Sequence, residues 1–309
     1  TYAGTPAPST IVISGFTLTG LRHDGMGAPL GAIATFAGST TIRDTVVTDS
    51  GSNIAGGVGY SLSPVLLGYG FSGDQFQLQS ATVERVVITD NHAYAGTGQT
   101  IESACGSIVT SAVNLSVTDS TFTNNSADIG AGPCFDGGTV AISNITSTGN
   151  TARIAWGSMF LIADHSTVTG SRFDGNSAKY GAGVVAYGRG VTPDSTVTFS
   201  SSSISSNHSL YGPTSAFEGI VVLDRMTIVG NVSSSGGTQN LDSPAAAVEI
   251  IGSATISTST IANNAGVGVL LTGGNFNLGS TGVSGRSGLA HSPADLAPAS
   301  PAPDSSLHL

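Results

Sequence analysis

One pattern of apolar and polar positions recurs along the chain. An apolar residue is followed five positions later by a second apolar residue, and three positions after that by Asn, as in Val117, Phe122 and Asn125. Seven repeats end on Asn, namely Asn91, Asn125, Asn150, Asn176, Asn207, Asn231 and Asn264. Three weaker repeats keep the apolar pair and end on Leu21, Ser50 and Arg286. The pattern therefore extends over most of the chain.

The repeats differ in length more than in kind. From Leu21 to Arg286 there are 265 residues in nine intervals, about 29 residues each, which is a repeat length typical of solenoids. The shortest interval is 22 residues (286 − 264) and the longest is 41 (91 − 50). Short strand-like runs broken by Gly, Asn and Ser fill the intervals, without helical periodicity. The sequence predicts an all-β fold, a right-handed single-stranded parallel β-helix of about ten coils.

Stacked coils place equivalent side chains in ladders along the core. The first predicted ladder contains Ile13, Ile42, Val83, Val117, Ile142, Val168, Phe199, Leu223 and Ile256. The second contains Leu18, Val47, Ile88, Phe122, Ser147, Phe173, Ile204, Ile228 and Ile261. We interpret the Asn positions as a structural column, because Asn tolerates left-handed backbone where a strand ends and stacked amides can hydrogen-bond along the axis.

The predicted domain organisation is a β-helix over residues 1–290 and a Pro/Ala/Ser-rich tail or linker over 291–309. An inserted loop at about 51–76 is the longest interruption and is unusually apolar. Because its large side chains cannot all face water comfortably, the loop packs on the wall of the helix or meets a protein partner. Its interaction candidates are Tyr60, Leu66, Leu67, Tyr69 and Phe71.

Two segments carry a tighter signature. Residues 122–132 read FTNNSADIGAG and residues 173–183 read FDGNSAKYGAG, so both follow F-x-x-N-x-A-x-x-G-A-G. This signature resembles the Phe-x-x-Asn and Gly-Gly-Ala repeat of the polymorphic outer membrane protein family, with the second glycine displaced. The resemblance implies a β-helical passenger displayed on a cell surface.

The amino-acid composition restricts the classes of partner that the chain is expected to bind. The net charge is −10, with 9 basic and 19 acidic residues, and no basic stripe is present, which argues against nucleic-acid binding. The sequence contains no run of 18 apolar residues, so it predicts no transmembrane segment. We expect an extracellular or cell-surface location, with surface glycans or proteins as partners, or further copies of the chain stacked end to end.

Two cysteines and five sequons are candidate modification sites. Cys105 and Cys134 lie in neighbouring predicted coils, and a disulfide between them would indicate an oxidising compartment. The N-x-S/T sequons provide glycosylation candidates at Asn114, Asn124, Asn144, Asn207 and Asn231.

No catalytic or metal-binding constellation stands out, and we expect no cofactor. The acids Asp90, Asp164, Asp174, Asp194 and Asp224 are dispersed instead of clustered. The favoured hypothesis is a non-catalytic structural or adhesive protein, such as a fibre or stalk subunit. The alternatives are a polysaccharide lyase or glycoside hydrolase, which would need two or three carboxylates close together in an acidic groove, and a protein-binding module that uses the 51–76 loop.

Overall fold

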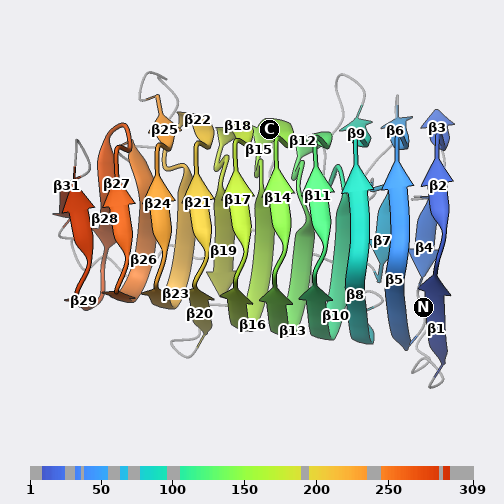
Figure 1. Cartoon of the computed structure of the whole chain (residues 1–309), viewed down its shortest axis with the longest axis horizontal. Coiled ribbons are helices and arrows are strands. Elements are labelled where there is room, and N and C mark those ends of the chain that lie inside the picture. Colours follow the sequence, from blue (N-terminus) through green and yellow to red (C-terminus); the bar gives the residue numbers. More distant parts are fainter. Residues whose placement is uncertain are drawn as a thin grey trace.

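The chain forms an all-β structure of stacked parallel strands (Figure 1). The computed structural model describes residues 9–24, 32–35, 38–54, 63–68, 77–95, 105–188, 195–234, 245–284 and 288–292. Every regular element among these residues is a strand, and neighbouring strands pair in parallel. The prediction of an all-β chain is confirmed. No described segment is a helix that is long and apolar enough to cross a membrane.

The strands fall into four rows, three in a 23-stranded sheet and one in an 8-stranded sheet. The first row contains β4 (Ile33–Thr35), β7 (Val65–Leu67), β19 (Val184–Gly188), β28 (Val267–Thr272), β31 (Gly288–Ser292) and the first halves of β10 (Ile108–Thr118), β13 (Cys134–Ser143), β16 (Met159–Thr169), β23 (Ser215–Asp224) and β26 (Ala246–Ser257). The second row contains the second halves of those five strands, β1 (Thr10–Ser14), β20 (Thr196–Ser200), β29 (Phe276–Leu278) and the first halves of β5 (Ser39–Thr48) and β8 (Leu78–Thr89).

The third row contains the second halves of β5 and β8 together with β2 (Thr17–Thr19), β11 (Thr121–Thr123), β14 (Thr146–Thr148), β17 (Arg172–Asp174), β21 (Ser203–Ser205), β24 (Thr227–Val229), β27 (Thr260–Ala262) and β30 (Gly282–Ser284). The fourth row is the 8-stranded sheet of β3 (Arg22–Asp24), β6 (Gly51–Ile54), β9 (His92–Ala95), β12 (Ser126–Ile129), β15 (Thr151–Ala155), β18 (Ser177–Tyr180), β22 (His208–Tyr211) and β25 (Val232–Ser233). In each row, a strand pairs with the equivalent strand of the next repeat.

Both predicted core ladders are confirmed by the register of the strands. In the second row, Val117 is paired with Val83 on one side and Ile142 on the other, and Ile142 is paired with Val168. In the third row, Phe122 is paired with Ile88 and Ser147. The ladder residues from Ile42 to Ile261 are buried, and all of them except the polar Ser147 belong to one continuous apolar core.

The end of each third-row strand differs in one respect from the sequence prediction. The left-handed residue is the one before the Asn column, for example Asn124 with φ 54° before Asn125. Equivalent positions are occupied by Gly20, Asp49, Asp90, Gly149, Gly175, Ser206, Gly230 and Asn263, all with positive φ. The column Asn itself turns inward and is buried, so its role is hydrogen bonding instead of tolerance of left-handed backbone.

The boundaries of the predicted loop and tail are also corrected. Part of the range 51–76 is regular, because Gly51–Ile54 and Val65–Leu67 are the strands β6 and β7. β31 runs to Ser292, two residues into the range predicted as tail. The rest of that tail, residues 293–309, lies outside the described residues.

Candidate functional site

The seven Asn of the column form one buried hydrogen-bonded file along the molecule. The Oδ1 of Asn150 accepts from the backbone N–H of Asn125 at 2.9 Å and from its Nδ2 at 3.2 Å. The Nδ2 of Asn150 donates to the Phe122 carbonyl of the preceding repeat at 3.0 Å. The same arrangement joins Asn91 to Asn125, Asn150 to Asn176, Asn176 to Asn207, Asn207 to Asn231 and Asn231 to Asn264. These amides are engaged inside the core and offer nothing to a ligand.

Two of the five glycosylation candidates belong to this file. Asn207 and Asn231 are fully buried, and their Nδ2 atoms donate to the carbonyls of Phe173 and Ile204. A glycan on either nitrogen would remove these hydrogen bonds and has no space in the core, so both candidates are wrong for the folded chain. Asn114, Asn124 and Asn144 are exposed and remain candidate glycosylation sites.

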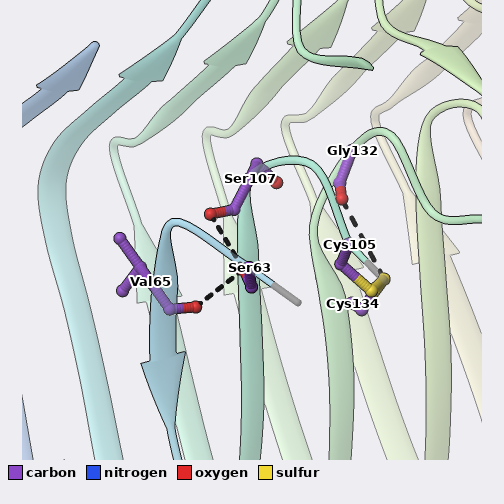
Figure 2. The surroundings of a disulfide bond; sticks show 6 residues. All are labelled: Ser63, Val65, Cys105, Ser107, Gly132 and Cys134. Atoms are coloured by element: carbon purple, nitrogen blue, oxygen red, sulfur yellow. Dashed lines mark hydrogen bonds between the residues drawn. A yellow bond between two sulfur atoms is a disulfide. The ribbon is translucent and has the colours of Figure 1, made fainter. Parts of the chain in front are cut away.

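The structure joins Cys105, three residues before β10, and Cys134, the first residue of β13, in a disulfide (Figure 2). Both residues are buried, and the bond links two neighbouring repeats. The hydroxyl of Ser63 lies 2.9 Å from the Val65 carbonyl and 3.2 Å from the Ser107 carbonyl. The disulfide therefore belongs to a packed structural region.

The interaction-loop candidates divide into two groups. Leu66 and Leu67 are buried in β7, which pairs with β4 and β10, so they cannot present themselves to a partner, and their assignment to an interaction loop is wrong. Tyr60, Tyr69 and Phe71 lie outside the described residues.

The first row carries two faces. Its residues alternate between the main core, which contains Phe135 and Leu161, and a separate apolar cluster, which contains Cys134 and Phe160. Successive residues of a strand point to opposite sides of the sheet, so the second cluster lies on the outer side of the row. By register this outer side continues from Phe160 through Val185 and Ala216 to Glu249. We call this surface the outer face of the first row.

Three aromatic rings meet on the outer face. Trp156 lies parallel to Phe160, with 3.6 Å between ring centroids and 7° between the planes. Tyr187 meets Phe160 edge to face, with centroids 6.1 Å apart. Trp156 and Tyr187 are partly buried, whereas Phe160 is buried. The rings thus form a small platform supported from below by β16 and β19.

Two carboxylates lie further along the outer face, on the two strands that follow β19 in the first row. Glu218 on β23 is partly buried, and Glu249 on β26 is buried, with its Oε1 3.3 Å from the Thr272 hydroxyl. Glu249 lies opposite Ala216, two residues before Glu218. One strand across and two residues along corresponds to roughly 8 Å between the two Cα atoms.

The two carboxylates act electrostatically on Tyr187. Burial raises the pKa of Tyr187 to about 12, and the charges of Glu218 and Glu249 add to this rise. Burial also raises the pKa of Glu218. Tyr187 therefore remains a hydrogen-bond donor over the physiological range, beside two groups that accept.

Sequence reasoning did not identify this site. Glu218 and Glu249 lie in the apolar strand runs SAFEG and AAAVEII, and an ionisable residue inside such a run was the available signal. Their proximity to Tyr187 depends on strand register, which the sequence pattern did not define for the first row. Among the described residues, no group of three or more His, Cys, Asp or Glu side chains is arranged to hold a metal ion.

Comparison with protein-family models and with curated proteins finds no match to the chain.

Proposed function

We propose that the chain is a right-handed parallel β-helix that acts outside the cell as a non-catalytic structural or adhesive rod. Parallel pairing between equivalent strands of successive repeats supports the solenoid, and parallel crossover connections are right-handed in nearly all proteins. The Phe-x-x-Asn signature supports display on a cell surface.

The observation that carries the proposal is the buried Asn file from Asn91 to Asn264. Together with the apolar ladders it fills the interior over six repeat-to-repeat steps. Because apolar side chains and hydrogen-bonded Asn amides fill the interior, any ligand must be met by the outer surface. A stiff, closed core is what a stalk or adhesive rod requires.

The disulfide supports an extracellular location. Disulfides persist in oxidising compartments and are rare in reducing ones, and this one is buried between two repeats. The exposed Asn114, Asn124 and Asn144 are the remaining sites where glycans could be attached without loss of core hydrogen bonds.

A co-sedimentation experiment tests adhesion. The folded chain is mixed with insoluble cellulose, chitin and peptidoglycan, and the fractions retained in the pellet and released as soluble sugar are measured. We expect retention on at least one polymer without release of reducing ends or unsaturated sugars. No retention on any polymer would contradict the adhesive role.

A polysaccharide-degrading enzyme is the second candidate, favoured by Glu218 and Glu249 beside Tyr187. Glycoside hydrolases use a pair of carboxyl groups, one of which has a raised pKa and donates a proton, and burial raises the pKa of Glu218. Release of reducing ends that is lost in both Glu218→Gln and Glu249→Gln would support this candidate and exclude the non-catalytic role.

A further inference from the structure

We propose that Trp156, Tyr187 and Glu218, on the outer face of the first row, form a binding site for an uncharged polysaccharide. The inference rests on the proposed adhesive function and names the surface and the chemical class of ligand through which it acts. Phe160 supports the site from below, and Glu249 extends it along the stack.

Trp156 has an unusual backbone conformation for its residue type. Trp156 has φ 65°, whereas the equivalent corner residues of neighbouring repeats, with similar φ, are Gly130, Gly181 and Gly212. Left-handed backbone is unfavourable for a bulky side chain, whereas Gly adopts it freely. Gly would adopt this corner without strain, whereas the Trp156 ring packs on Phe160 and stays partly exposed, so we take its exposed part as the surface that meets a ligand.

The shape and polarity of the platform indicate a sugar. Trp and Tyr provide flat apolar area with polar edges and lose little side-chain entropy when they bind a ligand. Around the rings, the carboxylate of Glu218 accepts hydrogen bonds and the hydroxyl of Tyr187 donates them. A sugar ring offers both an apolar C–H face for the rings and hydroxyl groups for these partners.

The charges on the outer face favour an uncharged polysaccharide over an acidic one. The first-row strands that the structure describes contain no Lys or Arg, while Glu218 and Glu249 lie on their outer face. A polyuronate would bring its carboxylates towards two protein carboxylates with no cation on these strands to offset the repulsion. The outer face therefore favours neutral sugars and disfavours acidic ones.

Trp156 is also a built-in reporter, because it is the single tryptophan of the chain. Cellohexaose, xylohexaose and mannohexaose are titrated into the full chain at low salt, with hexagalacturonic acid as the charged probe. We expect at least one neutral hexasaccharide to change the tryptophan emission with saturation. The charged probe should bind at least tenfold more weakly than the best neutral one.

Calorimetry on variants locates the binding. Trp156→Gly installs the residue of the neighbouring corners, so it should fold with unchanged circular dichroism and bind the best neutral probe at least tenfold more weakly. Glu218→Gln should narrow the difference between the neutral and charged probes. Phe276→Ala removes an exposed aromatic ring of the second row and should bind like the native chain.

Three results would overturn the inference. They are unchanged affinity in Trp156→Gly, equal affinity for hexagalacturonic acid, and no emission change with any neutral probe. If the chain still sediments with an insoluble polymer in these cases, the adhesive function stands and only the assignment of site and ligand fails. If sedimentation is also absent, both fail.

Discussion

The buried Asn residues show how one side chain can satisfy a turn inside a core. Each column Asn follows a left-handed residue, where the backbone changes direction and would leave N–H and C=O groups without strand partners. Its amide accepts from one repeat and donates to a carbonyl, as Asn176 does between Asn150 and Ser147. Asp would keep the acceptor, lose the donor and bury a charge, which explains why the column contains amides.

Asn150→Ala tests the cost of interrupting the file. The substitution leaves the backbone N–H of Asn125 and the carbonyl of Phe122 without their partners inside the core. Each such buried group costs about 1–3 kcal/mol, so we expect the free energy of unfolding to fall by about 3 kcal/mol or more. Urea denaturation followed by circular dichroism measures it.

Asn124→Gly is the matched control for this loss. Asn124 is exposed and has φ 54°, a conformation that Gly adopts without strain. The control should change stability by less than about 1 kcal/mol. Equal losses in the two variants would show that the buried file has no special energetic role.

The ionisation of Glu218 predicts a pH dependence of stability. Its pKa is raised in the folded chain, so the folded state binds the proton more tightly than the unfolded state. The resulting stability is fully present below the ordinary value of 4.5 and is lost as pH rises through the raised pKa. Compared with the Glu218→Gln variant, the native chain should lose stability as the pH rises through this pKa. The midpoint of urea denaturation at several pH values measures the loss.

Asp44 provides a comparison of opposite sign. The hydrogen bond from Arg85 of the next repeat lowers the pKa of Asp44, so its contribution is lost as pH falls through the lowered value. Relative to Asp44→Asn, the native chain should lose stability only in acid, below the ordinary value of 3.8. The same slope for both carboxyls would contradict the assigned causes.

At the scale of elements, the Gly-Ala-Gly corners explain the tight signature in the sequence. These corners connect the fourth row to the first row, at residues 130–132 and 181–183. A Cβ on Gly132 would lie 1.5 Å from the carbonyl oxygen of Ser158 in the next repeat. The third position of the motif is thus small because two backbones approach closely, not because its own φ requires Gly.

Gly132→Ala and Gly175→Ala separate these two reasons for glycine. Gly132→Ala must displace backbone, so we expect a loss of about 3 kcal/mol or more. Gly175 has φ 63°, but a Cβ on it would meet nothing within 4 Å, so Gly175→Ala should lose about 1 kcal/mol. Thermal and urea denaturation compare them. A larger loss at Gly175 would show that backbone conformation, not close approach, dominates at the corners.

The sequence was most informative for the second and third rows. Their strands follow a fixed spacing from the apolar pair to the Asn, so the pairing of Val117 with Ile142 and of Phe122 with Ser147 followed from alignment of the repeats. The connections that lead into the first-row strands differ in length between repeats. These strands therefore lie at no fixed sequence distance from the Asn. The neighbourhood of Tyr187, Glu218 and Glu249 therefore required the register, and so did the burial of Leu66 and Leu67.

At the scale of the whole molecule, each repeat contacts mainly the repeats before and after it. β13 pairs with β10 on one side and β16 on the other, and equivalent neighbours recur along the stack (Figure 1). Stability in such an arrangement is approximately a sum over repeats and their interfaces. A complete internal repeat is consequently a removable unit.

Deletion of residues 151–176 tests this property. It removes β15, β16 and β17 and joins Asn150 to Ser177, the residue that pairs with Thr151 in the native register. Asn150 then stacks on Asn207, and Ser147 on Ile204, so both files continue. We expect a folded chain with unchanged strand content by circular dichroism and a length shorter by about 4.8 Å in X-ray scattering.

Deletion of residues 151–163 is the control, because it removes β15 and only the first-row half of β16. The chain then enters the second row directly from the Asn column, and the first and fourth rows each lose one strand without a replacement. The exposed ladder groups left on their neighbours should make this variant unfold or aggregate. If the shorter deletion folds as well as the complete one, repeat phase does not govern the structure, and the description of the molecule as a sum of stacked units fails.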